Sequence, residues 1–205
     1  MRTPAPDLVP EDDEIRALVS LTGQRLNERQ PEITRAMTDL LAHIEYLDGD
    51  PKLLALLEAS VEGNVKTIFH VLINDISIAN LQPTTAAVEY AERLAQRGVT
   101  ANSLVRAYHM GQDDLMASCF EEAQRLDCDS ELKLRVVHRI SGVLYQYIDW
   151  ICLYLLDIYE AEQARWSTTA GHVRTALLHA ILAGDEAASA SFEVEAGYRL
   201  DQHHV

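Results

Sequence analysis

The chain has eight histidines in 205 residues, and their spacing is the first test for a metal or haem site. A di-iron bundle needs Glu-x-x-His motifs, and a zinc peptidase needs His-Glu-x-x-His. No histidine before residue 200 has a glutamate three positions earlier, and His-Glu-x-x-His is absent. A haem needs one axial histidine in an apolar groove, and the cofactor-binding candidates are His70 and His109, which both have apolar neighbours. Because a single helical histidine is more often solvated or hydrogen-bonded, we expect no metal and no cofactor.

Catalytic motifs are missing from the sequence. It contains no glycine-rich phosphate loop, no Gly-x-Ser-x-Gly elbow and no cysteine–histidine signature. Two pairs of adjacent acids, Asp113-Asp114 and Glu121-Glu122, offer carboxylates, but neighbouring residues on a helix point about 100° apart. Neither pair forms a two-carboxylate site, and we expect both to lie on a solvated helix face. The sequence therefore predicts a protein without catalytic residues, not an enzyme.

Aromatic side chains gather in one later segment of the chain. They are Tyr145, Tyr147, Trp150, Tyr154 and Tyr159. Packing in a core or an interface is their ordinary role, and an aromatic-lined pocket for a small ligand is the alternative. The three- and four-residue steps from Val137 to Ile158 also fit a dimer seam. Because apolar residues flank this stripe on both sides, an intramolecular core explains most of it.

Residues 86–110 have the order of a DNA-binding helix-turn-helix: a helix, a turn with Gly98 and a second helix. The stretch from Ala101 to Glu131 has two arginines and seven acids. Such a surface repels the phosphates of DNA. We therefore expect an ordinary helical hairpin, with Leu104 and Tyr108 in the core.

The charge balance excludes further classes of partner. The chain has 17 basic and 32 acidic residues and a net charge of −15, which opposes binding to nucleic acid or to an anionic membrane. Its three cysteines form no Cys-x-x-Cys pair, which indicates reduced thiols. The N-terminus has no apolar run, so we expect no signal peptide, and no apolar stretch reaches about 18 residues, so we expect no membrane span. The reduced thiols indicate a cytoplasmic protein.

Apolar residues recur at three- and four-residue steps, and glycine and proline are scarce. This pattern predicts an all-α fold, a single helical bundle of about seven to eight helices with a long central helix. The signals for helix ends are Asp12 or Asp13, Pro31, Asp50-Pro51, Thr84 or Thr85, Gly98, Thr100 and Asp127–Ser130. We expect the longest helix, after residue 130, to be buried nearly all round and to break or kink at Gly171.

Two runs of residues, ANSLVRAYHMGQDDLM (101–116) and GVLYQYIDWICLYLLDIYEAEQARW (142–166), carry a resemblance to a known family. They resemble the N-terminal helical domain of actinobacterial PucR/CdaR-type transcriptional regulators. That domain is similar to the RsbR-type (RsbRD N-terminal) sensory module, so the resemblance implies a globin-like fold that generally lacks haem. In such regulators a degenerate GGDEF-like domain and a helix-turn-helix follow. Residues 175–185 resemble the connecting helix and residues 196–205 the start of the GGDEF-like domain, so the chain looks truncated before both.

These observations give a domain plan and a function as expectations. The plan is a flexible tail (1–11), a helical sensory domain (12–170), connecting helices (171–196) and a stub of the missing downstream domain (197–205). We expect a non-catalytic regulatory input and dimerisation module of a transcriptional regulator. It would form a homodimer, respond to an unknown small-molecule signal and not itself bind DNA. The alternative is a stand-alone haem- or small-molecule-binding helical sensor protein.

Overall fold

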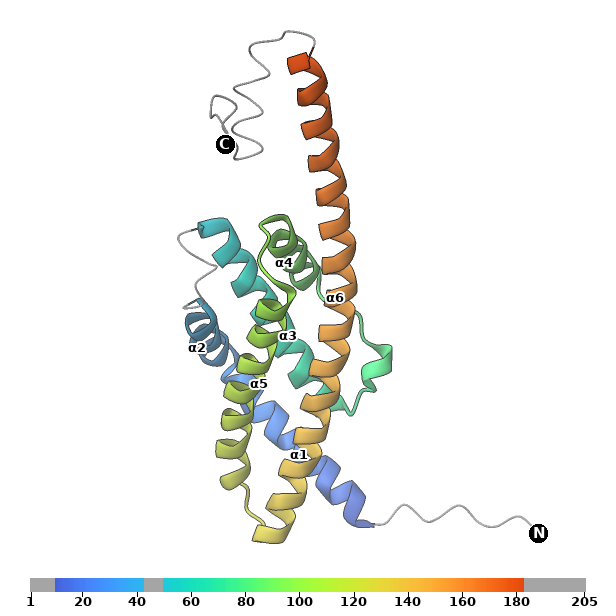
Figure 1. Ribbon diagram of the computed structural model, residues 1–205. Coiled ribbons are helices and arrows are strands. Elements are labelled where there is room, and N and C mark those ends of the chain that lie inside the picture. Colours follow the sequence, from blue (N-terminus) through green and yellow to red (C-terminus); the bar gives the residue numbers. More distant parts are fainter. Residues whose placement is uncertain (1–9, 43–49, 183–205) are drawn as a thin grey trace, which may run out of the picture. The chain divides into compact units, whose positions relative to one another are not determined.

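The computed structural model describes residues 10–42 and 50–182, which fall into two units that meet at Tyr159 and Glu160. These residues form six α-helices and one 3₁₀ turn and contain no strand, so the all-α prediction is confirmed (Figure 1). The elements are α1 (Pro10–Glu28), α2 (Gln30–Ala42), α3 (Pro51–Asn74), η2 (Ile78–Asn80), α4 (Thr85–Gln96), α5 (Ala101–Gln124) and α6 (Ser130–Leu182). The described helices number fewer than seven because α6 continues past Gly171, where the sequence predicts a break.

Local signals set most helix ends where the sequence predicts them. The Asp50 carboxylate accepts hydrogen bonds from two first-turn N–H groups of α3, at 2.8 and 3.3 Å. Thr84 and Thr100 cap α4 and α5 through their side-chain oxygens, and Asp129 accepts from a first-turn N–H of α6 at 2.8 Å. Gly98 follows α4 with a φ of 68°, a left-handed conformation that suits glycine. These caps satisfy N–H groups that have no partner inside the helix.

The first helix differs from its prediction at both ends. Helix α1 begins at Pro10, ahead of the predicted caps Asp12 and Asp13, and it ends at Glu28. Pro31 does not close α1 but lies in the first turn of α2, where its missing N–H costs no helical hydrogen bond. Most of the predicted tail, the end of the connecting segment and the stub lie outside the described residues.

The contribution of the Thr100 cap to the stability of α5 can be measured by mutation. Replacing Thr100 by alanine is expected to lower the free energy of unfolding by about 1 kcal/mol, because the N–H of Ser103 loses its side-chain acceptor at 3.3 Å and keeps only the carbonyl of Thr100, at 2.9 Å. The Thr100→Ser variant keeps a hydroxyl and should retain most of the stability. Urea denaturation followed by circular dichroism measures both values. Equal losses in the two variants would show that the cap is not the cause.

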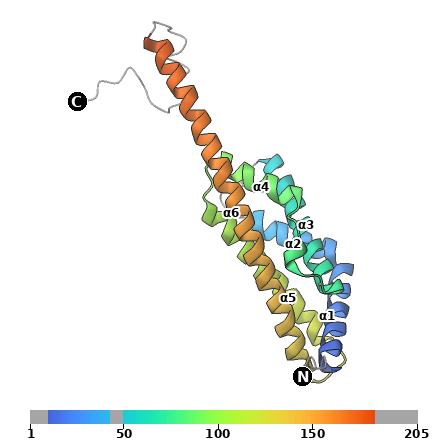
Figure 2. The same ribbon diagram turned by 90° about the vertical axis from the view of Figure 1, so that its right-hand side faces the viewer.

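Helix α3 packs against α1, α2 and α4 in the first unit (Figure 2). Two glycines bring these helices close together. A Cβ atom at Gly23 of α1 would lie 3.0 Å from Ile73 of α3, and one at Gly63 of α3 would lie 2.8 Å from Thr84. Helix α5 packs against α1, α2 and α4 as well, so α3 and α5 share the same neighbours.

Helices α5 and α6 lie side by side and antiparallel (Figures 1 and 2). Near the start of α6 the Ser141 hydroxyl is 3.7 Å from the Met116 sulfur. Farther along α6 the Tyr159 hydroxyl donates to the carbonyl of Val99, just before α5. The two contacts join the first unit's part of α6 to the chain at Met116 and at Val99.

The first unit buries one face of α6. Most of its buried side chains follow at steps of three and four residues, with Ile148 beside them: Val136, Ile140, Leu144, Tyr147, Ile151, Leu155 and Tyr159. The helix is the longest, as predicted, but it is not buried nearly all round. Leu134 and Tyr145 are each 69% exposed and Leu153 is 60% exposed. Apolar content predicts burial poorly here because it does not say which apolar side chains a neighbouring helix covers.

The second unit contains the end of α6, from residue 160 onward. Glu162 and Arg165 form an ion pair one turn apart, and the Thr168 hydroxyl donates to the carbonyl of Ala164 at 2.9 Å. Trp166 is 52% exposed. These two contacts are local ones along the helix.

Candidate functional site

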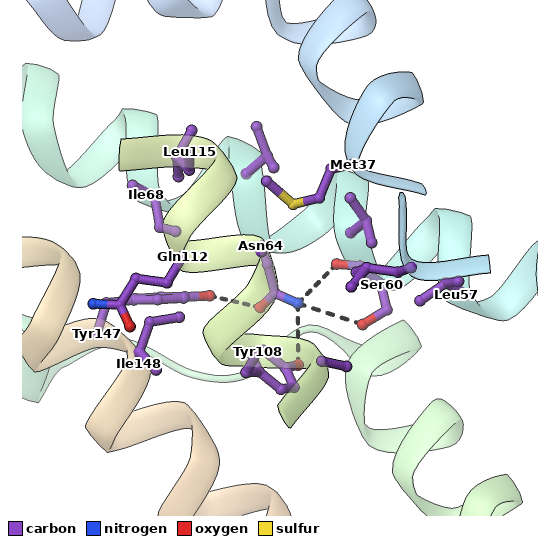
Figure 3. Close-up of a pocket in the computed structure, with 15 residues that line it drawn as sticks. Met37, Leu57, Ser60, Asn64, Ile68, Tyr108, Gln112, Leu115, Tyr147 and Ile148 are labelled. Carbon is purple, nitrogen blue, oxygen red and sulfur yellow. Dashed lines mark hydrogen bonds between the residues drawn. The ribbon is translucent and has the colours of Figure 1, made fainter. Parts of the chain in front are cut away.

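A cavity of about 50 Å³ lies between α2, α3, α5 and α6 in the first unit (Figure 3). Its walls are mostly apolar, and none of the described side chains that line it is charged. The walls come from Met37 and Leu41 of α2, from Leu57, Ser60, Val61, Asn64, Val65 and Ile68 of α3, from Ala107, Tyr108, Gly111, Gln112 and Leu115 of α5, and from Tyr147 and Ile148 of α6.

Helical periodicity explains why these side chains meet. On α3 the lining residues follow one another at steps that keep them on one face. On α5 the residues Tyr108, Gly111 and Leu115 have the same spacing, and the sequence predicts them on one apolar face, which the structure confirms. Gly111 has no side chain, which leaves room for Met37 on this face of α5. A Cβ atom at Gly111 would lie 3.3 Å from the sulfur of Met37.

Asn64 joins three helices through its side chain (Figure 3). Its amide nitrogen donates to the carbonyl oxygen of Ser60 at 2.8 Å and to the hydroxyl of Tyr108 at 3.2 Å, with Ser60 Oγ at 3.3 Å. Its amide oxygen accepts from the hydroxyl of Tyr147 at 2.7 Å. Because Tyr108 belongs to α5 and Tyr147 to α6, one buried carboxamide connects α3 with both.

Burial keeps both tyrosine hydroxyls of this cluster neutral. Loss of solvent raises the pKa of Tyr108 and the pKa of Tyr147 well above the usual range. The neighbouring Tyr108 raises the pKa of Tyr147 further, whereas the hydrogen bond from Asn64 lowers the pKa of Tyr108 by less than burial raises it. The cluster therefore presents neutral donors and acceptors to the cavity.

The raised tyrosine pKa values predict a loss of stability in alkali. Above about pH 10 an unfolded tyrosine ionises, while buried Tyr147 keeps its proton in the folded state. The folded state then binds more protons, so the free energy of unfolding falls with pH, by about 1.4 kcal/mol per pH unit for each such tyrosine. Below that pH both states are protonated and this contribution is constant.

Thermal unfolding followed by circular dichroism, at pH values from about 8 to 11, measures this slope. The Tyr147→Phe variant lacks the titrating hydroxyl, so its stability should fall less steeply than that of the natural sequence. Identical slopes for the two proteins would contradict the assignment to Tyr147.

The apolar periodicity of the sequence predicts Tyr108 and Tyr147 on buried helix faces but does not single out Asn64 or Ser60. A signal for Asn64 exists in the sequence. It lies in phase with Val61 and Ile68 on the apolar stripe of α3, where a polar side chain must find a hydrogen-bond partner. The identity of that partner depends on other helices and is not contained in the local pattern.

The two histidine candidates lie outside the cavity. His70 on α3 and His109 on α5 are both exposed. The Nδ1 atom of His70 is 3.0 Å from the amide nitrogen of Asn74, and Nδ1 of His109 is 3.3 Å from the amide oxygen of Gln112. Neither imidazole has the apolar surroundings that an axial haem ligand needs, and a haem role for them stays an untested prediction. Among the described residues, no three potential metal-ligating side chains of the His, Cys, Asp and Glu types gather at one place.

Glu122 corrects the prediction that the paired acids lie on a solvated face. Its side chain is only 3% exposed and accepts hydrogen bonds from Arg29 at 2.9 Å and from Arg125 at 2.5 Å. Two arginines thus compensate the buried carboxylate. Its neighbour Glu121 is exposed, so the prediction holds for one acid of the pair. The ion pair joins α5 to the turn between α1 and α2.

The aromatic side chains of α6 do not converge on the cavity. Tyr147 lines it, whereas Tyr145 is exposed. The ring of Trp150 contacts two tyrosine rings of the same helix in tilted arrangements, with its centroid 5.6 Å from that of Tyr147 and 6.3 Å from that of Tyr154. Of the five aromatic residues that could have lined a ligand pocket, only Tyr147 is among the described residues that line this cavity.

Residues 86–110 form most of α4, a loop and the start of α5, an ordinary helical hairpin as predicted. Leu104 is 1% exposed, and the Tyr108 hydroxyl belongs to the Asn64 cluster. The side of α5 with these two residues is therefore committed to the protein interior. Within the described part of the chain, no helix combines the length and apolar character needed to span a bilayer.

Comparison with known families gives one match. Residues 31–174 match the family described as RsbT co-antagonist protein rsbRD N-terminal domain. The matched segment covers more than half of the chain and includes every described residue that lines the cavity. The comparisons with curated proteins and with solved structures found no match.

Proposed function

Because the chain belongs to the rsbRD N-terminal domain family of RsbT co-antagonist proteins, a family of regulatory, non-catalytic domains, we propose that it is the sensory input and dimerisation module of a transcriptional regulator. The resemblance of residues 101–116 and 142–166 to PucR/CdaR-type regulators supports this setting. In such a regulator, DNA recognition belongs to other domains.

The observation that carries the proposal is a cavity with α6 in its wall. Tyr147 and Ile148 of α6 line the cavity, and Tyr147 donates to Asn64 at 2.7 Å. A change in what fills the cavity changes the packing and hydrogen bonding of α6 at these two residues. A ligand that binds one arrangement of α6 more tightly shifts the population toward it.

The outer face of the same helix is the surface that we assign to a homodimer. Leu134, Tyr145 and Leu153 are exposed there and fall within about 100° of one another around the helix. A Cβ atom added at Gly142, between them, would meet nothing within 4 Å. A symmetric pair of α6 helices would bury this stripe, which also contains the exposed Asp149, and join the two cavities through one interface.

Charge supports a module that does not itself bind DNA. The net charge of −15 opposes the counterion release that drives binding to a phosphate backbone. The apolar face of α5 is directed into the core and the Asn64 cluster. We place the protein in the cytoplasm, where its three free cysteines stay reduced.

The test joins the chain to a repressor DNA-binding domain that occupies its operator only as a dimer. Repression of a reporter should be at least about tenfold stronger than with the DNA-binding domain alone, and the Leu153→Glu fusion should lose this gain. Equal repression by both fusions, at equal amounts in the cell, would refute dimerisation through α6. A gel shift of duplex DNA by the unfused chain at physiological salt would refute the absence of DNA binding.

A stand-alone small-molecule-binding protein is the second candidate, and the cavity favours it as well. Such a protein would bind its ligand without altering repression in the fusion. The haem form of this candidate predicts a visible haem absorption band in protein from haem-supplied cells. The exposed imidazoles of His70 and His109 favour a spectrum without that band.

A further inference from the structure

We propose that the cavity beside Asn64 binds a neutral molecule of about two to four non-hydrogen atoms that carries one hydroxyl or carbonyl oxygen. Short-chain alcohols and aldehydes have this chemistry. The role of such a molecule as a signal rests on the proposed function, whereas its binding does not.

The size of the ligand follows from the volume of the cavity. A water molecule needs about 10–15 Å³, and an engineered apolar cavity of about 150 Å³ in another protein holds benzene. The cavity here has about 50 Å³, which lies between these cases. Met37 forms part of the wall, and a methionine side chain has the freedom to adjust to a slightly larger guest.

The absence of charge follows from the lining. No described side chain in the walls is charged, so an ion in the cavity would lose its hydration without a compensating partner. The hydroxyls of Tyr108 and Tyr147 keep their protons because burial raises the pKa of both groups. A carboxylate, phosphate or ammonium compound is therefore excluded from this site.

The oxygen of the ligand follows from the polar side of the cavity. Apart from Asn64, which is occupied by four contacts, Ser60 and Tyr108 also line the cavity, and the hydroxyl of each is already in contact with the amide nitrogen of Asn64. A hydroxyl rotates to donate or accept, so this pair suits either an alcohol or a carbonyl oxygen. The remaining wall is mostly aliphatic, apart from Gln112 and Tyr147, and suits the carbon end of the molecule.

A ligand of this size binds weakly, with a dissociation constant of about 10⁻⁴ M or weaker, because each non-hydrogen atom contributes a limited free energy. The test is therefore a titration of the full chain with 1-propanol, followed by the NMR signals of isoleucine methyl groups. The methyls of Ile68 and Ile148, which line the cavity, should shift to saturation. The methyl of Ile15 on α1, outside the cavity, should not show the same curve.

Two glycine variants form a matched pair for this titration. Gly111→Ala places a methyl group in the cavity, next to Met37. Gly142→Ala makes the same change on α6 outside the cavity, on the face assigned to the homodimer, so it also controls for an effect of association on binding. We expect the first to weaken propanol binding at least tenfold and the second to leave it unchanged. Circular dichroism spectra and melting curves are the check that both variants fold.

Binding of dissolved xenon shows whether the cavity selects its ligand by size alone or also by the ligand's oxygen atom. Xenon occupies apolar cavities without hydrogen bonds. Ser60→Ala should weaken propanol binding at least fivefold and xenon binding by less. Saturable binding of xenon without propanol would overturn the assignment of an oxygen-bearing ligand. Shifts that grow linearly with propanol, or that are equal in the Gly111→Ala protein, would overturn the site.

The repression assay of the fusion keeps this inference apart from the proposed function. Saturable propanol binding without an effect on repression would leave the site intact and remove its role as a sensor. Loss of propanol binding in a chain that still dimerises and represses would overturn the ligand class and leave the regulatory function standing.

Discussion

Replacing Asn64 by alanine is expected to lower the free energy of unfolding by about 2–4 kcal/mol. The substitution removes the acceptor of the Tyr147 hydroxyl, which is buried, and the donor to Tyr108. A buried hydroxyl without a partner costs about 1–3 kcal/mol, and the enlarged cavity beside residue 64 adds to this. Urea denaturation followed by circular dichroism measures the change.

Asn74 provides a matched control on the same helix. Its side-chain amide donates to the carbonyl of His70 at 2.9 Å, the same backward contact that Asn64 makes with Ser60, but Asn74 is exposed. Water can replace this hydrogen bond, so Asn74→Ala should change the free energy of unfolding by about 0.5 kcal/mol or less. Similar losses in the two variants would show that the buried cluster contributes nothing beyond the local contact.

The double variant Asn64→Ala, Tyr147→Phe tests whether the two side chains act as a pair. If Asn64→Ala lowers the free energy of unfolding because the Tyr147 hydroxyl loses its partner, then removing that hydroxyl should recover part of the lost stability. The two single changes and the double change form a cycle, and we expect an interaction energy of about 1 kcal/mol. If the effects of the two single changes simply add up in the double variant, the loss of stability in Asn64→Ala comes from packing alone.

Helix ends in this protein were predictable because their causes are local. A cap such as Asp50 or Thr100 needs a side-chain oxygen within three residues of the N–H that it accepts from. Gly98 is similar, since a positive φ after a helix favours glycine whatever the surroundings. Pro31 shows the limit: proline suits the position after one helix and the first turn of the next equally well.

Burial was less predictable because it depends on neighbours that are distant in sequence. Tyr145 and Tyr147 are equally apolar and two positions apart, yet the first is exposed and the second is buried. Glu122 looks like its neighbour Glu121, but Arg29, 93 residues away in sequence, reaches the first of them in the interior. The candidate site also depends on residues that are distant in sequence, because the hydrogen-bond partners of Asn64 include hydroxyls on two other helices.

The exposed stripe of α6 leads to the second large effect, on association. Light scattering of the full chain at low micromolar concentration should give about twice the 22.9 kDa of one chain. The double variant Tyr145→Glu, Leu153→Glu should give the mass of one chain. Each apolar side chain buried in an interface contributes about 1.5–3 kcal/mol, so losing two weakens the dimer at least about 100-fold.

Leu54→Glu is the control for this association. Leu54 is 41% exposed on α3, so it offers a comparable apolar side chain away from the stripe of α6. A new carboxylate there adds the same charge to the surface without burying it against a second copy. We expect this variant to keep the dimer, which would exclude a general effect of added negative charge on a chain that is already strongly acidic.

A mass that stays at 22.9 kDa as the protein is concentrated would rule out the homodimer. A dimer that resists both glutamates would move the interface away from Tyr145 and Leu153. A dimer through α6 would also couple the interface to the cavity, because Tyr147, two residues from Tyr145, belongs to the Asn64 cluster. If α6 carries the signal, Tyr147→Phe should alter the dimer dissociation constant by more than twofold, although its hydroxyl is buried and cannot contact the second copy.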